Sequence, residues 1–158
     1  MNLLPFFEWC EASFIGAGIR ASLWLFPAIE CVHLLGLVML GGAVLVVDLR
    51  LLGLGLRDQP LDRIGRDAQR WLLAGVVTMI ATGVPLFLSE AVKCYYSTAF
   101  WVKILTLGPA IVYALTVRRR VVLAGEGRVG PAWRGLTALV SIGLWFTVAA
   151  GGRWIGFS

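Results

Sequence analysis

The chain alternates long apolar stretches with short charged segments, and four of the stretches are long enough to cross a hydrocarbon core. They occupy about residues 22–47, 71–89, 98–117 and 135–152. Lipid gives backbone groups no water to bond, and the runs lack the alternation of barrel strands, so each is predicted to be a helix. We therefore expect an all-α fold, an integral membrane four-helix bundle that forms one transmembrane domain over residues 1–158.

Shorter amphipathic segments flank these runs. Residues 6–15 mix aromatic side chains with Glu8 and Glu11, which predicts a short N-terminal helix lying in the membrane interface ahead of the first span. Residues 61–69 predict a similar segment at the opposite face, leading into the second span. Neither segment is apolar or long enough to cross the membrane itself.

Composition agrees with a membrane protein, because 59% of residues are hydrophobic and 15% are charged. Ten of the fourteen cations lie in the two segments that join the first span to the second and the third to the fourth: Arg50, Arg57, Arg63, Arg66, Arg70, Arg118, Arg119, Arg120, Arg128 and Arg134. By the positive-inside rule these segments are cytoplasmic, and both termini lie outside. The net charge of +5 follows from this topology, and we expect no nucleic-acid partner.

Three ionisable residues, Glu30, His33 and Lys103, interrupt the spans, and such residues are costly in lipid and mark functional sites. His33, the single histidine, lies in the first span, and Lys103 lies in the third. Each is fifteen residues from the charge that ends its span on the cytoplasmic side, Asp48 and Arg118 respectively. At 1.5 Å per helical residue, both are predicted about 22 Å above that boundary. The sequence thus places an imidazole and an ammonium at one level of the outer leaflet.

Further charged residues are predicted slightly higher, at about 27–30 Å on the same count: Glu30, Glu90 and Arg153. Glu30 and His33, followed by Gly36 or Leu37, recur at helical spacing and share one face of the first span. Gly36 leaves space beneath the imidazole, which a flat ligand, a neighbouring helix or a water would fill. Four helices therefore contribute to one polar layer.

The sulfur-containing residues of the spans and the outer half are interpreted as structural. Met79 lies nine residues from Arg70, which places it about 13 Å above the cytoplasmic boundary and well below His33. It is interpreted as a core-packing residue. Cys31 and His33 are two residues apart and lie on roughly opposite faces of a helix, which argues against a local Cys–His metal site. Cys31 is interpreted as an inert buried thiol. Cys10 and Cys94 both fall in the outer half, where a disulfide between them is an open alternative.

His33 and Lys103 each allow a structural and a functional interpretation. His33 either bonds to a neighbouring helix or to Glu30, or offers a neutral imidazole to haem iron, to a metal or to a proton. Lys103 either forms a salt bridge with Glu30 or Glu90, or anchors a propionate or another anionic ligand. With one histidine in the chain, bis-histidine haem ligation within a single copy is excluded.

The segments PAIECVHLLGLVMLGGAVLVVDLRLLGL, FWVKILTLGPAIVYA and GGRWIGF resemble an uncharacterised family of small bacterial four-helix membrane proteins, with DLRLLG and GRWIGF the most specific words. More distantly, a first-span histidine and a third-span lysine resemble the copper-resistance protein D family and the bacterial haem-binding protoporphyrinogen oxidase family. These resemblances imply a bacterial inner membrane with periplasmic termini, and copper handling or haem b ligated by the histidine. Only His33 and Lys103 carry over.

The leading hypothesis is an outer-leaflet polar site that binds haem b, or less favourably copper, in a redox role. His33 would be the metal ligand, and Lys103, Glu30, Gly36 and Arg153 would surround the cofactor. The alternative is a non-catalytic accessory subunit, packed in a larger membrane complex or a homo-oligomer. The sequence contains no nucleophile paired with a base, phosphate-binding glycine loop or zinc-ligand spacing, so no enzyme class is assigned.

Overall fold

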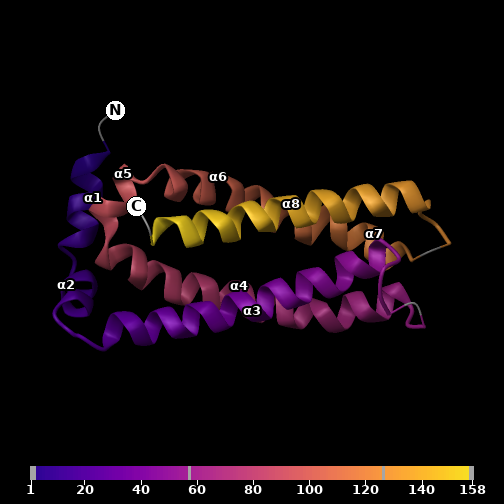
Figure 1. Cartoon of the computed structure of the whole chain (residues 1–158), viewed down its shortest axis with the longest axis horizontal. Coiled ribbons are helices and arrows are strands. Elements are labelled where there is room, and N and C mark those ends of the chain that lie inside the picture. Colours follow the sequence, from indigo (N-terminus) through magenta and orange to yellow (C-terminus); the bar gives the residue numbers. More distant parts are fainter. Residues whose placement is uncertain (1–2, 57, 126, 157–158) are drawn as a thin grey trace.

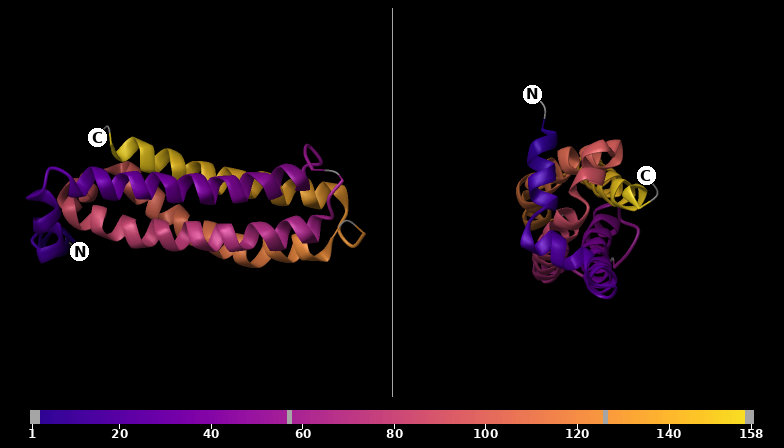
Figure 2. Two further views of the ribbon diagram at one scale, coloured as in Figure 1. Left: turned by 90° about the horizontal axis from the view of Figure 1, so that it is seen from below. Right: turned by 90° about the vertical axis from the view of Figure 1, so that its left-hand side faces the viewer.

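The computed structural model describes residues 3–56, 58–125 and 127–156, and all regular structure within them is helical. Four helical rods are long and apolar enough to cross a membrane, and they run side by side (Figures 1 and 2). They are α3 (Leu25–Leu51), α4 (Leu61–Ser89), the continuous rod of α6 (Thr98–Tyr113), η1 (Ala114–Arg118) and α7 (Arg119–Ala124), and α8 (Pro131–Ile155). The expected four-helix membrane bundle is confirmed.

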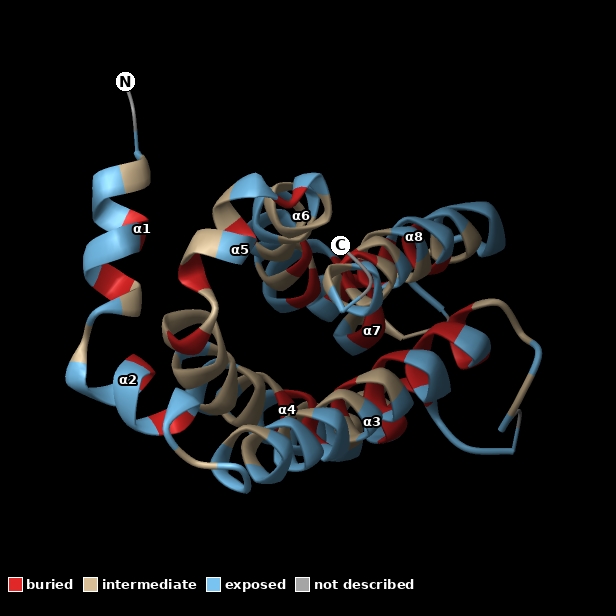
Figure 3. Ribbon diagram, turned by 60° about the vertical axis from the view of Figure 1, so that its left-hand side comes forward, coloured by how far each residue is buried: buried red, intermediate tan, exposed pale blue. Residues whose placement is uncertain are grey.

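The outward positions of these helices are exposed (Figure 3), and many of them carry large apolar side chains. Val38, Leu105 and Phe146 are each more than two-thirds exposed, at 71%, 72% and 72%. Such a surface is unfavourable in water and is matched by hydrocarbon. The chain is therefore a multi-pass membrane protein.

Three short helices cover one end of the bundle: α1 (Leu4–Glu11), α2 (Phe14–Arg20) and α5 (Ala91–Tyr96). We call this the capped end, and the first and last described residues lie there too (Figure 1). The described residues of the two connecting segments, 52–56 with 58–60 and 125 with 127–130, lie at the opposite end, which we call the loop end. The single interfacial helix expected over 6–15 is two helices, because the Ser13 backbone is extended and its hydroxyl caps α2 by accepting from Gly16 N–H at 3.2 Å.

Polar contacts fasten the capped end to the bundle. The Arg20 guanidinium donates to the carbonyls of Glu11 at 2.7 Å and Ser89 at 3.1 Å. The Glu11 carboxylate accepts from Val92 N–H at 2.7 Å, in the first turn of α5, where a negative charge is favourable. These bonds hold α1, α2 and α5 against the last turn of α4, at the capped end of the bundle.

The four rods form a curved row in the order α4, α3, α8, α6, since α3 packs on both α4 and α8, and α8 packs on α6. Small residues allow the closest approach. A Cβ added at Gly75 of α4 would lie 2.9 Å from the backbone nitrogen of Leu40 in α3. Buried Leu40, Val44, Leu72 and Trp145 fill the centre of the bundle.

The helices extend beyond their apolar runs at the loop end. The second begins at Leu61 rather than residue 71, so the segment 61–69 is the start of α4, and the third continues to residue 124 rather than 117. The first and fourth span 25–51 and 131–155 rather than 22–47 and 135–152. Ion pairs within the first turns of α4, Asp62 with Arg66 at 2.8 Å and Asp67 with Arg70 at 3.4 Å, favour this extension. Arg57, counted above with the loop cations, lies outside the described residues.

Candidate functional site

The level of each side chain is fixed by contacts between neighbouring helices. Gly36 of α3 lies against Thr78 and Met79 of α4, and Leu40 lies against Gly75. Asp48 of α3 and Arg118 of η1 form a buried ion pair, with Nε 2.7 Å from Oδ1. Because this pair brings the two reference charges together, residues fifteen positions away on α3 and α6 reach the same level at the capped end.

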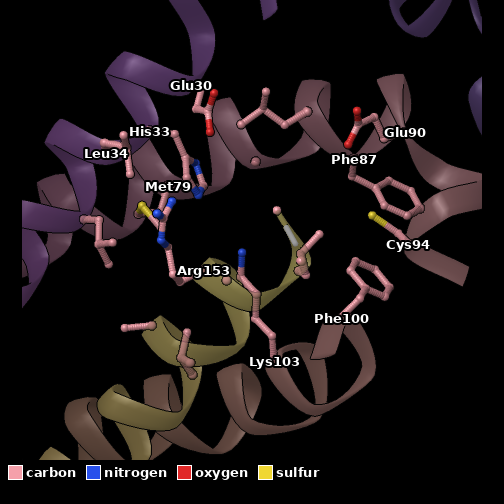
Figure 4. Close-up of a pocket in the computed structure, with 18 of the residues that line it drawn as sticks. Glu30, His33, Leu34, Met79, Phe87, Glu90, Cys94, Phe100, Lys103 and Arg153 are labelled. Atoms are coloured by element: carbon pink, nitrogen blue, oxygen red, sulfur yellow. The ribbon is translucent and has the colours of Figure 1, made fainter. Parts of the chain in front are cut away.

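A cavity of about 260 Å³ lies at that level between α3, α4, α6 and α8. His33, Lys103, Glu30 and Arg153 all line it. Figure 4 shows the imidazole of His33, the ammonium of Lys103 and the guanidinium of Arg153 turned toward the same space. The structure therefore brings together four of the five site residues expected from the sequence.

His33 is held by α4 in a defined orientation. Its Nδ1 lies 2.8 Å from Thr82 Oγ1, and the Thr82 hydroxyl donates to the Thr78 carbonyl at 2.6 Å. Since that hydroxyl proton is already used, Nδ1–H donates to Thr82, and the lone pair of a neutral imidazole lies on Nε2. The bond to a neighbouring helix is the one that the structural interpretation required. The same bond leaves Nε2 able to accept a proton or bind a metal.

Lys103 is surrounded by small residues of α8. A Cβ added at Gly152 would lie 3.4 Å from Lys103 Nζ, and one at Gly151 would lie 3.1 Å from Lys103 Cβ. Across the described ranges no carboxylate pairs with this ammonium, and Glu90 lies instead 4.0 Å from Lys93. The expected salt bridge of Lys103 with Glu30 or Glu90 is therefore wrong within those ranges.

The other expected site residues occupy different positions. Glu30 and Arg153 are exposed and form the rim of the cavity. Gly36 is buried one turn below His33, where a Cβ would lie 2.9 Å from Thr78 Cγ2, and it does not line the cavity. Of the occupants considered for the space beneath the imidazole, the neighbouring helix is the one observed.

The sequence did not predict several residues that line the cavity, and it placed Met79 at the wrong depth. Met79 lines the cavity, because α4 begins well before Arg70 and the contact with Gly36 sets Met79 only one turn below His33. The depth counted from Arg70 was therefore too small. Phe87 and Phe100 also line the cavity and stack at 5.5 Å with an interplanar angle of 11°.

The three cysteines are free thiols. Cys31 is exposed on α3, so its interpretation as a buried thiol is wrong, because its face of the helix is turned outward from the bundle. Cys10 and Cys94 are both buried at the capped end, and Cys94 lines the cavity. Burial, followed by the nearby Glu90 carboxylate, raises the pKa of the Cys94 thiol to about 11.

A second hollow, of about 530 Å³, adjoins the cavity on the side where α4 and α6 face each other. His33, Lys103, Met79, Phe87 and Phe100 line both spaces. The remaining walls of this hollow are apolar, with Ile80 and Val84 on α4 and Ile104 on α6 among them, and we call it the slit. The site thus has a charged rim on one side and a hydrocarbon-like extension on the other.

Comparison with known proteins gives one match. A protein-family model described as "Family of unknown function (DUF6644)" matches residues 6–158. The chain belongs to this family. No curated protein and no solved structure matched. Membership of this family of unknown function confirms the expected uncharacterised family, whereas the distant resemblance to the copper-resistance protein D and protoporphyrinogen oxidase families gains no support from the comparisons.

Proposed function

We propose that this membrane protein binds haem b in the cavity, where His33 Nε2 would bind the iron, and serves a redox role. The observation that carries the proposal is the hydrogen bond from His33 Nδ1–H to Thr82. Metal-binding histidines commonly donate their other ring N–H to a fixed acceptor, which sets the tautomer and the ring orientation. Bound haem would supply one-electron chemistry at its iron.

The charges and the walls of the site fit such a ligand. Lys103 and Arg153 are cations that would bind the two propionates. Gly83 lets the imidazole lie close against α4, since a Cβ there would lie 3.3 Å from His33 Cε1. The apolar slit suits the hydrocarbon edge of a porphyrin, and cofactor sites typically combine mainly apolar walls with a few placed polar groups.

The ligand set favours haem over a copper ion. Among the described residues no three His, Cys, Asp or Glu side chains come together as a metal cluster. A copper ion would therefore lack most of its ligands, whereas the iron of haem is coordinated by four porphyrin nitrogens and needs only one or two ligands from the protein. We further propose that the loop end is cytoplasmic and that the cavity opens near the periplasmic face of a bacterial inner membrane.

The visible spectrum of the purified protein tests this proposal. The wild type should show a Soret band, and His33→Ala should shift or lose it. Thr82→Val, which removes the acceptor of the Nδ1–H bond, should weaken haem affinity about tenfold or more. Thr106→Val is the matched control, because Thr106 is a half-buried threonine of α6 whose hydroxyl donates to Val102 in its own helix.

Two results would contradict the proposal. One is a Soret band that is unchanged in His33→Ala. The other is a colourless wild type, expressed with adequate haem supply, that takes up no added haem. A colourless protein that co-purifies with a larger membrane complex would instead support the accessory-subunit function.

A further inference from the structure

The slit is bounded at both ends and open in the middle of the bundle. At the loop end, α7 packs on α4, with Val122 lying directly over Gly65. At the capped end, Phe87 of α4 stacks on Phe100 of α6, and Phe7 of α1 lies against both rings. Between these two closures α4 and α6 are the outer members of the helix row. The opening therefore lies between the membrane-spanning parts of α4 and α6, at the depth expected for the hydrocarbon core.

The slit forms an apolar path from the lipid-facing surface to His33. Ile80 and Val84 of α4 and Ile104 of α6 line it and are also 52%, 52% and 44% exposed. Leu107 and Trp145 continue the lining toward the centre of the bundle. The inner end is polar, where His33 and Lys103 belong to both the slit and the cavity.

We infer that the slit between α4 and α6 is a lateral entrance through which haem b, dissolved in the bilayer, reaches His33. This inference rests on the proposed function. An amphipathic macrocycle partitions into lipid, so entry from the membrane exposes no apolar surface to water. The propionates complement Lys103, at the inner end of the slit, and Arg153, in the adjoining cavity. On the opposite side the charged rim of Glu30 and Arg153 faces outward.

The test narrows the slit without touching the ligands. Val84→Trp and Ile104→Trp place an indole in the entrance from each wall. The matched controls are Val77→Trp on α4 and Leu105→Trp on α6, whose native side chains are 64% and 72% exposed and lie outside the slit. Apoprotein in phosphatidylcholine nanodiscs is mixed with haem-loaded vesicles of the same lipid, and the rise of the Soret band gives the uptake rate.

Both entrance variants should take up haem about tenfold more slowly than the controls and reach the same final spectrum. Val84→Ala, which widens the entrance and removes little packing, should take it up faster than the wild type. Equal uptake rates in the entrance variants and the controls would overturn the lateral entrance, as would unchanged uptake in Val84→Ala. Absence of any Soret band in the wild type overturns the proposed function itself. The wild-type measurement alone gives that result, whereas the entrance is tested only by comparing the variants.

Discussion

The buried ion pair between Asp48 and Arg118 should be among the costliest interactions to break in this bundle. Asp48 is 0% exposed and Arg118 is 4% exposed. The guanidinium donates to the carboxylate at 2.7 Å and to the Val44 carbonyl at 3.0 Å. Arg118→Met keeps the length of the side chain and removes its charge, which leaves the carboxylate uncompensated. Breaking one partner of such a pair costs about 3–5 kcal/mol.

The free energy of unfolding in mixed micelles, titrated with sodium dodecyl sulfate and followed by circular dichroism, measures this cost. Asp48→Leu should be as harmful as Arg118→Met, and the double variant should be milder than either, because both charges are then gone. The double-mutant cycle should give a coupling energy of about 2–3 kcal/mol. The control is Arg66→Met, whose pair with Asp62 is solvent-exposed and should cost less than about 1 kcal/mol.

The pair also aligns the site, since it joins the two points from which His33 and Lys103 are each fifteen residues away. Single variants should therefore weaken haem binding as well as the fold. An Arg118→Met variant no less stable than Arg66→Met would refute the reasoning, because the pair would then be no anchor for the register of α3 and α6.

Three further predictions concern other parts of the molecule. Gly75→Ala forces a Cβ to within 2.9 Å of Leu40 and should cost about 1–3 kcal/mol in the same titration, whereas Gly108→Ala, with open space around it, should cost little. Glu11→Ala removes the acceptor for Val92 N–H, so amide exchange in α5 should accelerate and stability fall by about 0.5–2 kcal/mol. Because the pKa of Cys94 is raised from 9.0 to about 11, iodoacetamide labelling of Cys94 in a folded Cys10→Ser/Cys31→Ser variant should stay slow at pH 8 and rise toward pH 11. The stabilisation from burying that neutral thiol is present below pH 9 and is lost as the pH rises through 11, and rapid labelling at pH 8 would contradict this account.

The apolar runs were sufficient to predict the number and type of the spanning helices, because only helices satisfy the backbone in lipid without a barrel pattern. Their ends were not predictable from hydropathy alone. The charged turns 61–70 and 118–124 continue as helix through ion pairs and packing at the loop end. The π-helical turn at Ala114–Arg118, which ends at the residue with the buried guanidinium, has no signal in the apolar pattern.

The shared level of His33 and Lys103 was predictable, because each lies fifteen residues from a charge at the loop end of its span. The structure adds a physical cause, since those two charges, Asp48 and Arg118, form an ion pair. The partner of His33 had a signal that was not used. Thr78 and Thr82 are four residues apart in an otherwise apolar span and therefore lie on one face of α4. The slit had no sequence signal, because it depends on which two helices of four are left facing each other.

The surroundings of Lys103 bear on why the site exists at all. Folding alone would favour an ammonium at this depth that is paired with a carboxylate, and Glu30 and Glu90 line the same cavity. Within the described part of the chain that pairing does not occur, and α8 presents Gly151 and Gly152 to the lysine instead. Lys103 is half-buried, and under the proposed function a bound propionate would supply the anion that the two carboxylates do not. The same reasoning applies to His33 Nε2, whose lone pair is left available by the bond at the other nitrogen. An unpaired donor and an unpaired acceptor on facing walls of one cavity are complementary to an anionic, metal-bearing ligand such as haem.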